Sequence, residues 1–264
     1  MKRGRPPGKR RKNRGLARTK PGTSKRSRKG RHYKTKVEGR RGETVPENIG
    51  ISQAEGTKGV KSAISPLARQ AWRTASLVMG EGPPGLSLYG EINQGGLTRI
   101  FDALVVHSGF GAKSCLLDVG CGTGKVLLHA VLQYDVTKAR GVEMSDYRVM
   151  SAKWALDLVR KRLPETKALL RGRIRLLYSS VQAMNRWNGV THVYMYDLGM
   201  PDAVYIDLLR LWSESKSVVA LVSYRKPNWL WRHGFDLCLL DKIKVKQQGV
   251  GAGSHTAYVY GKRQ

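Results

Sequence analysis

The fold is decided by residues 114–125, which are Ser114-Cys115-Leu116-Leu117-Asp118-Val119-Gly120-Cys121-Gly122-Thr123-Gly124-Lys125. An apolar run, a glycine-rich turn and an apolar helix at 126–132 are typical of the first unit of an α/β sheet. Further strands are expected at 139–143, 174–179, 192–196 and 217–224, with helices at 146–162 and 203–213. The last segments, 235–245 and 256–260, flank a glycine-rich turn and predict an antiparallel hairpin. The sequence therefore predicts a doubly wound, seven-stranded, mostly parallel sheet.

Positive charge is concentrated at the beginning of the chain. The 264 residues include 48 Lys plus Arg and 19 Asp plus Glu, a net charge of +29. Residues 1–42 hold 19 basic residues and one acid, so 19 − 1 = +18 lies there, with few aliphatic side chains. Such a segment cannot bury enough apolar surface to fold alone, and it attracts polyphosphates. We expect a disordered tail and linker at 1–65 that binds nucleic acid, and a folded domain at 66–264.

A short motif in this tail favours the nucleus. Gly4-Arg5-Pro6, inside a basic stretch, resembles an AT-hook, whose arginine enters a narrow minor groove. A nuclear-import segment is the equally weighted alternative, and both hypotheses predict a nuclear protein.

Composition excludes several other classes. Hydrophobic residues make up 41% of the chain, enough for a core. The sequence has no apolar run of membrane-spanning length and no secretory signal, so we expect an intracellular protein without membrane contact. The three cysteines lack CxxC spacing, and the six histidines include no pair at ligand spacing. Neither a disulfide framework nor a metal site is predicted.

The spacing of the glycine-rich turn indicates which ligand it binds. Asp118 to Gly124 read D-x-G-x-G-x-G, which differs from the G-x-G-x-x-G turn that holds a dinucleotide pyrophosphate. Glycines let the backbone approach the amino-acid part of S-adenosylmethionine, while Asp118 places a carboxylate near its ammonium group. Glu143, about 25 residues on, ends the next strand and can accept hydrogen bonds from both ribose hydroxyls. The alternative is a structural turn with an incidental surface glutamate.

The turn and the closing hairpin together resemble class I S-adenosylmethionine-dependent methyltransferases. More narrowly, the chain resembles Dot1 histone lysine methyltransferases, through Tyr89-Gly90-Glu91, residues 118–126 and Gly141-Val142-Glu143. This resemblance implies methyl transfer to a lysine in the core of histone H3 on nucleosomes. Matched by position, the expected cofactor-binding residues are Tyr89, Glu91, Asp118, Gly120, Gly122, Gly124, Lys125, Glu143, Ser180 and Asp197.

The chain departs from the Dot1 pattern at two of these positions. Asp197 replaces an asparagine that abuts the methyl donor, and Ser179 or Ser180 stands where an adenine-contacting acid is expected. Tyr196, Asp197 and Tyr258 are the expected catalytic residues, because a lysine must lose its proton in an aromatic-walled channel before it attacks. Candidates for the channel wall are Tyr224, Trp229, Tyr258 and Tyr260. Ordinary packing is the alternative role for each aromatic residue, and a helix N-cap is the alternative for Asp197.

Two other functions fit the same features. An RNA or DNA methyltransferase would share the fold and the charge, and a chromatin-binding module could retain the fold without activity. The alternating Lys242, Lys244 and Lys246 predict either a solvated strand face or a second phosphate-contacting patch.

Overall fold

The structure is a computed structural model that describes residues 62–78, 90–249 and 253–263. The chain divides into two units, residues 1–50 and 51–264, and every described residue belongs to the second unit. The predicted tail therefore lies almost entirely outside the described residues, and its disorder and its boundary at residue 65 stay predictions.

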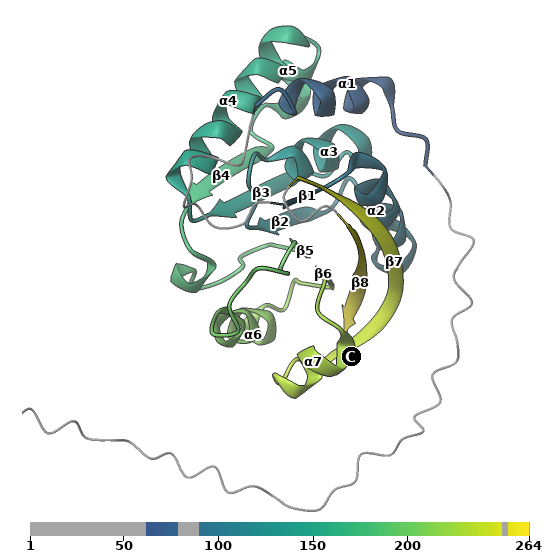
Figure 1. Ribbon diagram of the computed structural model, residues 1–264, viewed down its shortest axis with the longest axis vertical. Helices are drawn as coiled ribbons and strands as arrows, with labels where there is room; N and C mark the ends of the chain where they lie inside the picture. The colour runs from purple at the N-terminus through teal and green to yellow at the C-terminus, as the bar shows by residue number, and fades with distance from the viewer. Residues whose placement is uncertain (1–61, 79–89, 250–252, 264) are drawn as a thin grey trace, which may run out of the picture. The chain divides into compact units, whose positions relative to one another are not determined.

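The described strands form one sheet (Figure 1). They are β1 (Gly90–Ile92), β2 (Cys115–Val119), β3 (Lys138–Glu143), β4 (Ile174–Tyr178), β5 (His192–Met195), β6 (Ala220–Ser223), β7 (Leu237–Gly249) and β8 (Ser254–Lys262). Their spatial order is β1-β7-β8-β6-β5-β2-β3-β4. The five strands β4, β3, β2, β5 and β6 are parallel, and β8 is antiparallel to both β6 and β7.

The predicted α/β sheet and its closing hairpin are thus confirmed, with one addition. The seven expected strands are present, and β1 adds an eighth by pairing antiparallel with the end of β7. A segment of three residues that begins with glycine is too short to show the alternation that marks a strand. This segment therefore has no sequence pattern that predicts a strand.

Helices cover both faces of this sheet (Figure 1). They are α1 (Pro66–Ala75), α2 (Gln94–Ser108), α3 (Lys125–Tyr134), α4 (Asp146–Arg162), α5 (Thr166–Leu170), the 3₁₀-helix η1 (Val181–Ala183), α6 (Val204–Glu214) and α7 (Pro227–Arg232). Buried residues of α1 to α5 share one hydrophobic cluster, and those of α6, α7 and η1 share a second. In β2, Leu116 belongs to the first cluster and Leu117 to the second, as the alternation of a buried strand requires.

Local sequence signals set the ends of several helices. The Asn93 side chain accepts a hydrogen bond of 2.7 Å from the Gly96 N–H and begins α2, and Gly109 ends it at φ +67°. The Ser145 side chain accepts from the Arg148 N–H at the start of α4. None of the described helices combines the length and the hydropathy that crossing a bilayer requires.

Candidate functional site

The glycine-rich turn joins β2 to α3 at the carboxyl edge of the parallel strands. Gly120, Gly122 and Gly124 have φ values of +79°, +50° and +76°, a backbone region that residues with a Cβ rarely adopt. The Gly120 and Cys121 N–H groups donate to the Val142 carbonyl at 2.8 and 3.1 Å, which ties the turn to β3. The turn thus presents open backbone at the edge where α/β sheets bind their ligands.

Gly141 on β3 allows this close approach. A Cβ at this position would lie 2.5 Å from the Cys121 Sγ, 2.7 Å from the Cys121 Cβ and 2.8 Å from the Leu127 Cδ1. Any larger residue would push the turn away from the sheet. The Gly141-Val142-Glu143 motif is thus partly a packing requirement of the turn.

Strand β1 brings Glu91 against the same turn. Its carboxylate forms an ion pair with the Lys125 ammonium and accepts a hydrogen bond of 2.9 Å from the Thr123 hydroxyl. Lys125 is 8% exposed, and its Nζ lies 5.6 Å from the centre of the Trp72 ring on α1. The Glu91–Lys125 ion pair therefore connects β1, the start of α3 and the Trp72 ring on α1. Both charged residues are predicted cofactor-binding residues.

A pocket of about 390 Å³, including its open mouth, lies between β1 and the turn. Six of the predicted site residues line it: Glu91, Asp118, Gly120, Gly122, Lys125 and Tyr196. The remaining lining residues are Trp72, Gly90, Ile92, Cys121, Thr123, Val126 and Tyr194.

Asp118 is the most unusual of these residues. It ends the apolar part of β2, pairs with Gly141 and Tyr194 on the neighbouring strands, and is 2% exposed. Burial, and then the charge of Glu143, raise the pKa of Asp118 well above its usual value. Its Oδ2 atom is buried and has no hydrogen-bond partner among the described residues. A buried acceptor in this state costs about 1–3 kcal/mol, so the site fits a ligand that brings a cationic donor.

Glu143 ends β3, as predicted, and is 4% exposed. Its carboxylate accepts hydrogen bonds from the Gly122 N–H at 3.1 Å and the Ser145 N–H at 3.0 Å. It therefore braces the glycine-rich turn against the start of α4. Because a carboxylate offers about four acceptor positions, it retains capacity for ligand hydroxyls, and its role in ribose binding stays a prediction.

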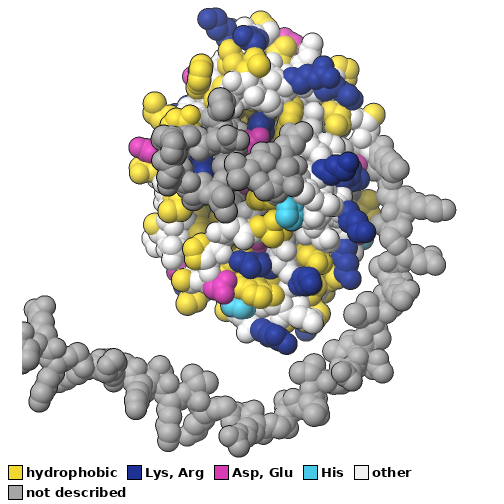
Figure 2. Space-filling view, viewed as in Figure 1, with side chains coloured by type: hydrophobic (Ala, Val, Ile, Leu, Met, Phe, Trp, Pro, Cys, Tyr) yellow, Lys and Arg dark blue, Asp and Glu magenta, His cyan; other side chains and the backbone are white. Residues whose placement is uncertain are grey.

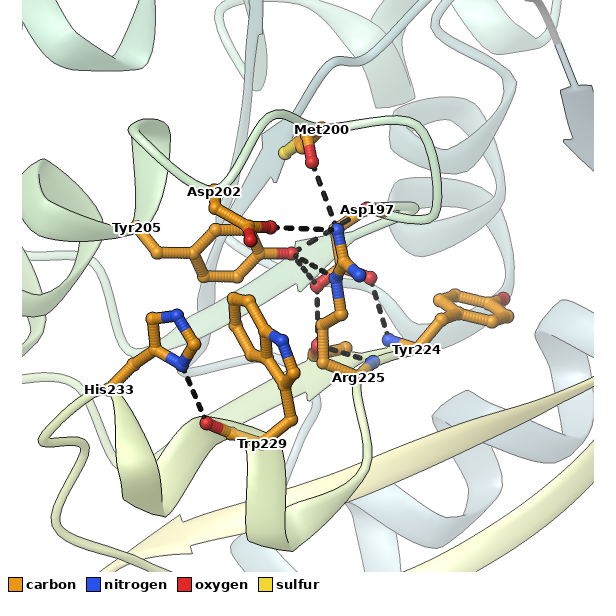
Figure 3. A network of polar contacts seen from close by, with 9 residues as sticks. Asp197, Met200, Asp202, Tyr205, Tyr224, Arg225, Trp229 and His233 are labelled. Atoms are coloured by element: carbon orange, nitrogen blue, oxygen red, sulfur yellow. Dashed lines mark hydrogen bonds and ion pairs between the residues drawn. The ribbon is translucent and has the colours of Figure 1, made fainter.

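Asp197 does not line the pocket and belongs to a network of polar contacts (Figure 3). It is fully buried, and its carboxylate accepts hydrogen bonds from the Tyr224 N–H at 2.7 Å, the Tyr205 hydroxyl at 2.8 Å and the Ser223 hydroxyl. Burial raises its pKa, and these hydrogen bonds oppose the shift. The helix N-cap considered for Asp197 is wrong, because the residue before α6 is Ala203. Asp197 instead fixes the end of β5 to the end of β6.

Arg225 extends this network (Figure 3). It donates to the Tyr205 hydroxyl at 3.2 Å and to the Met200 carbonyl at 3.0 Å, and it pairs with Asp202 at 3.7 Å. Its guanidinium lies 4.7 Å from the centre of the Trp229 ring. The loop after β5 is thus held to the segment that leads into α7.

The four aromatic candidates for a single channel are separated by the sheet. Tyr224 belongs to the hydrophobic cluster of α1 to α5, with Tyr196 packed against that cluster. Tyr260 belongs to the other cluster, and Tyr258 and Trp229 pack against it. Tyr258, a predicted catalytic residue, therefore does not line the pocket, and the expected channel is wrong in this form. The aromatic residues that do line the pocket are Trp72, Tyr194 and Tyr196.

The other predicted cofactor residues have different positions. Ser180 caps η1 by accepting from the Gln182 N–H at 3.2 Å, and it does not line the pocket. Gly124 precedes α3 in the left-handed conformation and supports the turn from outside the lining. Tyr89 lies outside the described residues.

Seven pocket residues were not among the predicted site residues, and three of them show why. Trp72 follows the helical pattern of α1 and was indistinguishable from a core residue. Cys121 lies inside the glycine-rich motif, so the motif itself could have identified it as a pocket residue. Tyr194 precedes the predicted Tyr196 by two residues, and strand alternation places both on one face. Its hydroxyl lies 3.2 Å from the Tyr224 hydroxyl.

Comparisons with known proteins identify the fold. No protein-family model matches the chain, and no curated protein matches its sequence. The crystal structure of a proposed RNA methyltransferase from Pyrococcus horikoshii is similar with a TM-score of 0.50 and 17% identity, over 75% of this chain and 98% of that one. A protein from Thermoplasma acidophilum gives a TM-score of 0.50 and 11% identity, over 76% and 99%. The chain has the class I methyltransferase fold. Neither structure is named as a histone methyltransferase.

Proposed function

We propose that the chain is an S-adenosylmethionine-dependent methyltransferase that modifies a lysine of histone H3 on nucleosomes. The observation that carries the cofactor part of this proposal is the buried Asp118 carboxylate with an unpartnered oxygen beside a glycine-rich turn. S-adenosylmethionine has an ammonium group that such an oxygen can bind, and its amino-acid part needs the close backbone approach that glycines allow. When bound, it supplies an electrophilic methyl group.

The chain's own residues then have distinct roles. Asp118 holds the ammonium group, and the backbone at Gly120 and Gly122 contacts the amino-acid part. Glu143 accepts hydrogen bonds from ribose hydroxyls while it keeps the turn in place. Glu91 and Lys125 neutralise each other at the pocket wall, so the net charge that the ligand meets comes from the acids at the ends of β2 and β3.

Tyr196 is the residue best placed to meet the nucleophile. It follows β5, lines the pocket, and stacks edge-on against Tyr224 with 4.6 Å between ring centres. Burial, and then the charge of Asp197, raise the pKa of Tyr196 to about 12, so its phenol is neutral at physiological pH. A neutral hydroxyl can accept a hydrogen bond from an amine and orient it. Asp197 acts as a positioning residue for this part of the pocket.

The lysine substrate is supported by three motifs that meet at one place. The Dot1-like segments at 90–91, 118–126 and 141–143 are far apart in the sequence, and all three contribute to the turn and the pocket wall. The charge of +29 suits a substrate on DNA, and the basic tail suits a nuclear protein. Nucleosomal DNA is the partner that we propose for the tail.

RNA is the second candidate substrate. The Pyrococcus horikoshii protein with this fold is described as a proposed RNA methyltransferase. The positive charge of the chain would serve an RNA substrate equally well, because the phosphate backbone dominates nucleic-acid affinity.

Transfer of a labelled methyl group to nucleosomes, free histones, DNA and RNA in parallel tests the proposal. We expect label in histone H3 only when it is nucleosomal, and its loss with Asp118→Asn. Label in RNA or DNA would agree with the proposed cofactor site and would show that the substrate is a nucleic acid instead of histone H3. No transfer to any substrate would contradict the enzymatic role and favour a chromatin-binding module.

A further inference from the structure

Strand β7 has a row of three exposed lysines, Lys242, Lys244 and Lys246, which we call the lysine row. They alternate with Ile243, which packs against the hydrophobic cluster of α1 to α5, and Val245, which is buried in it. All three side chains therefore leave the same face of the strand. We propose that the lysine row binds the phosphodiester backbone of a nucleic acid and leads it to the mouth of the pocket.

The charges of the lysine row are not neutralised within the described residues. No acidic side chain there pairs with any of the three ammonium groups. The residues opposite them on β8 are Tyr258, Thr256 and Ser254, all of which are uncharged. Figure 2 shows Lys and Arg side chains gathered on the side of the molecule where Figure 1 draws β7, with few acidic side chains among them. A solvated strand face normally mixes both signs, so this face is suited to an external polyanion.

A fourth cation contacts the backbone of the strand that carries the row. Arg99 on α2 donates a hydrogen bond of 2.9 Å to the Lys244 carbonyl. This contact holds the guanidinium against β7 and satisfies one of its carbonyls.

Two contacts place the end of the lysine row beside the pocket. Strand β7 continues directly from Lys246 into residues 247–249, which pair with β1, and all three residues of β1 line the pocket. The Asn93 N–H also donates to the Lys246 carbonyl at 3.2 Å. The end of the row therefore lies beside β1, which forms one wall of the pocket.

The geometry suits a phosphate backbone. Alternate residues of a strand are about 6.6 Å apart, whereas a duplex carries one phosphate about every 3.4 Å along each strand. Each lysine can therefore reach a separate phosphate. The competing explanation is that edge lysines prevent sheets from pairing edge to edge. Here β1 already covers part of that edge and Arg99 another part. Three aligned lysines are therefore not required to prevent edge-to-edge pairing.

The test compares two triple variants of the full chain. Lys242→Gln, Lys244→Gln and Lys246→Gln remove the row, and Lys113→Gln, Lys153→Gln and Lys216→Gln remove the same charge from exposed positions elsewhere. The measurement is the slope of the logarithm of the binding constant against the logarithm of salt concentration. For duplex DNA, we expect the row variant to flatten this slope by about 0.9 for each phosphate contacted, or about 2.7 for three. The control variant should change it far less.

A second measurement localises the contact despite the basic tail. Amine acetylation, read by mass spectrometry, should be slowed at the lysine row by duplex DNA and left unchanged at Lys113 and Lys216. RNA that protects the row where DNA does not would make RNA the nucleic acid. Equal salt slopes for the two variants, or equal protection by poly-glutamate, would overturn the inference. Row variants that only aggregate more would support edge protection instead.

This inference rests on the proposed function in one respect: the proposed reaction explains why a nucleic acid would be led to the pocket. Protection of the row in Asp118→Asn, which is expected to bind cofactor poorly, keeps the two questions separate. Protection without methyl transfer to any substrate would contradict the proposed enzymatic activity and support nucleic-acid binding by the lysine row. Methyl transfer without protection would contradict nucleic-acid binding by the row and support the enzymatic activity.

Discussion

Replacing Asp118 with asparagine should weaken S-adenosylmethionine binding while the apo protein stays folded. The change keeps the shape of a side chain that is 2% exposed and replaces a carboxyl group that can ionise beside the ligand's ammonium group with a neutral amide. A hydrogen bond to a charged group contributes about 1.5–3 kcal/mol. At 1.4 kcal/mol for each factor of ten, the dissociation constant should rise about 10- to 150-fold.

Thermal unfolding with added ligand measures this loss. A ligand at 100 times its dissociation constant stabilises the wild-type chain by about 2.7 kcal/mol. At the same ligand concentration, the variant should gain only about 0.3–1.4 kcal/mol. Asp102→Asn is the matched control: Asp102 is also buried, but it accepts from the Tyr134 hydroxyl at 2.8 Å, and it does not line the pocket. Equal ligand stabilisation of Asp118→Asn and wild type would refute the assignment.

The same substitution should change how stability depends on pH. Because burial and Glu143 raise the pKa of Asp118 in the folded state above the ordinary value of 3.8, the folded chain keeps this proton to a higher pH than the unfolded chain does. The free energy of unfolding of the apo protein therefore falls as pH rises from about 3.8 through the folded-state pKa. Asp118→Asn should remove this contribution, and urea unfolding at several pH values measures it. A steeper fall in the variant would contradict the sign.

Three further changes test the rest of the site. Gly141→Ala should destabilise the fold by about 1–3 kcal/mol, measured by urea unfolding, because its Cβ would lie 2.5 Å from the Cys121 Sγ; an unchanged midpoint would contradict the close approach. Glu91→Gln should destabilise more than the double variant with Lys125→Met does, because it leaves a buried ammonium unpaired; a double-mutant cycle with no coupling would refute this pairing. Burial lowers the pKa of His129 to about 3, so between pH 6.5 and 3 the unfolded chain binds a proton that the folded chain does not, and stability falls as the pH is lowered. His129→Gln should reduce this fall. An unchanged slope would exclude His129 as its source.

The strands and the glycine-rich turn could be predicted because their signals are local. Apolar runs with glycine punctuation define β2 and its turn, and the interval from Asp118 to Glu143 follows from one βαβ unit. The placement of Glu91 against Lys125 could not be predicted in the same way. It requires β1 to join the end of β7, and three residues carry no periodicity that predicts such pairing.

The error over Tyr258 has a different cause. Alternation correctly indicates that Tyr258 and Tyr260 share a face of β8, but it does not indicate which face meets the pocket. The structure turns both toward the cluster of α6 and α7, while Ala257 and Val259 belong to the other cluster. Asp197 shows the same limit, because its partners Tyr205 and Tyr224 come from elements that only tertiary packing brings together.

The cofactor site can be tested by a crystal structure of the chain with S-adenosylhomocysteine, the product that keeps the ammonium group and the ribose. We expect the ligand to lie over residues 120–124, with its ammonium nitrogen about 2.7–2.9 Å from the Asp118 Oδ2 and its ribose hydroxyls at Glu143. A ligand bound elsewhere, or one whose ammonium group avoids Asp118, would contradict it.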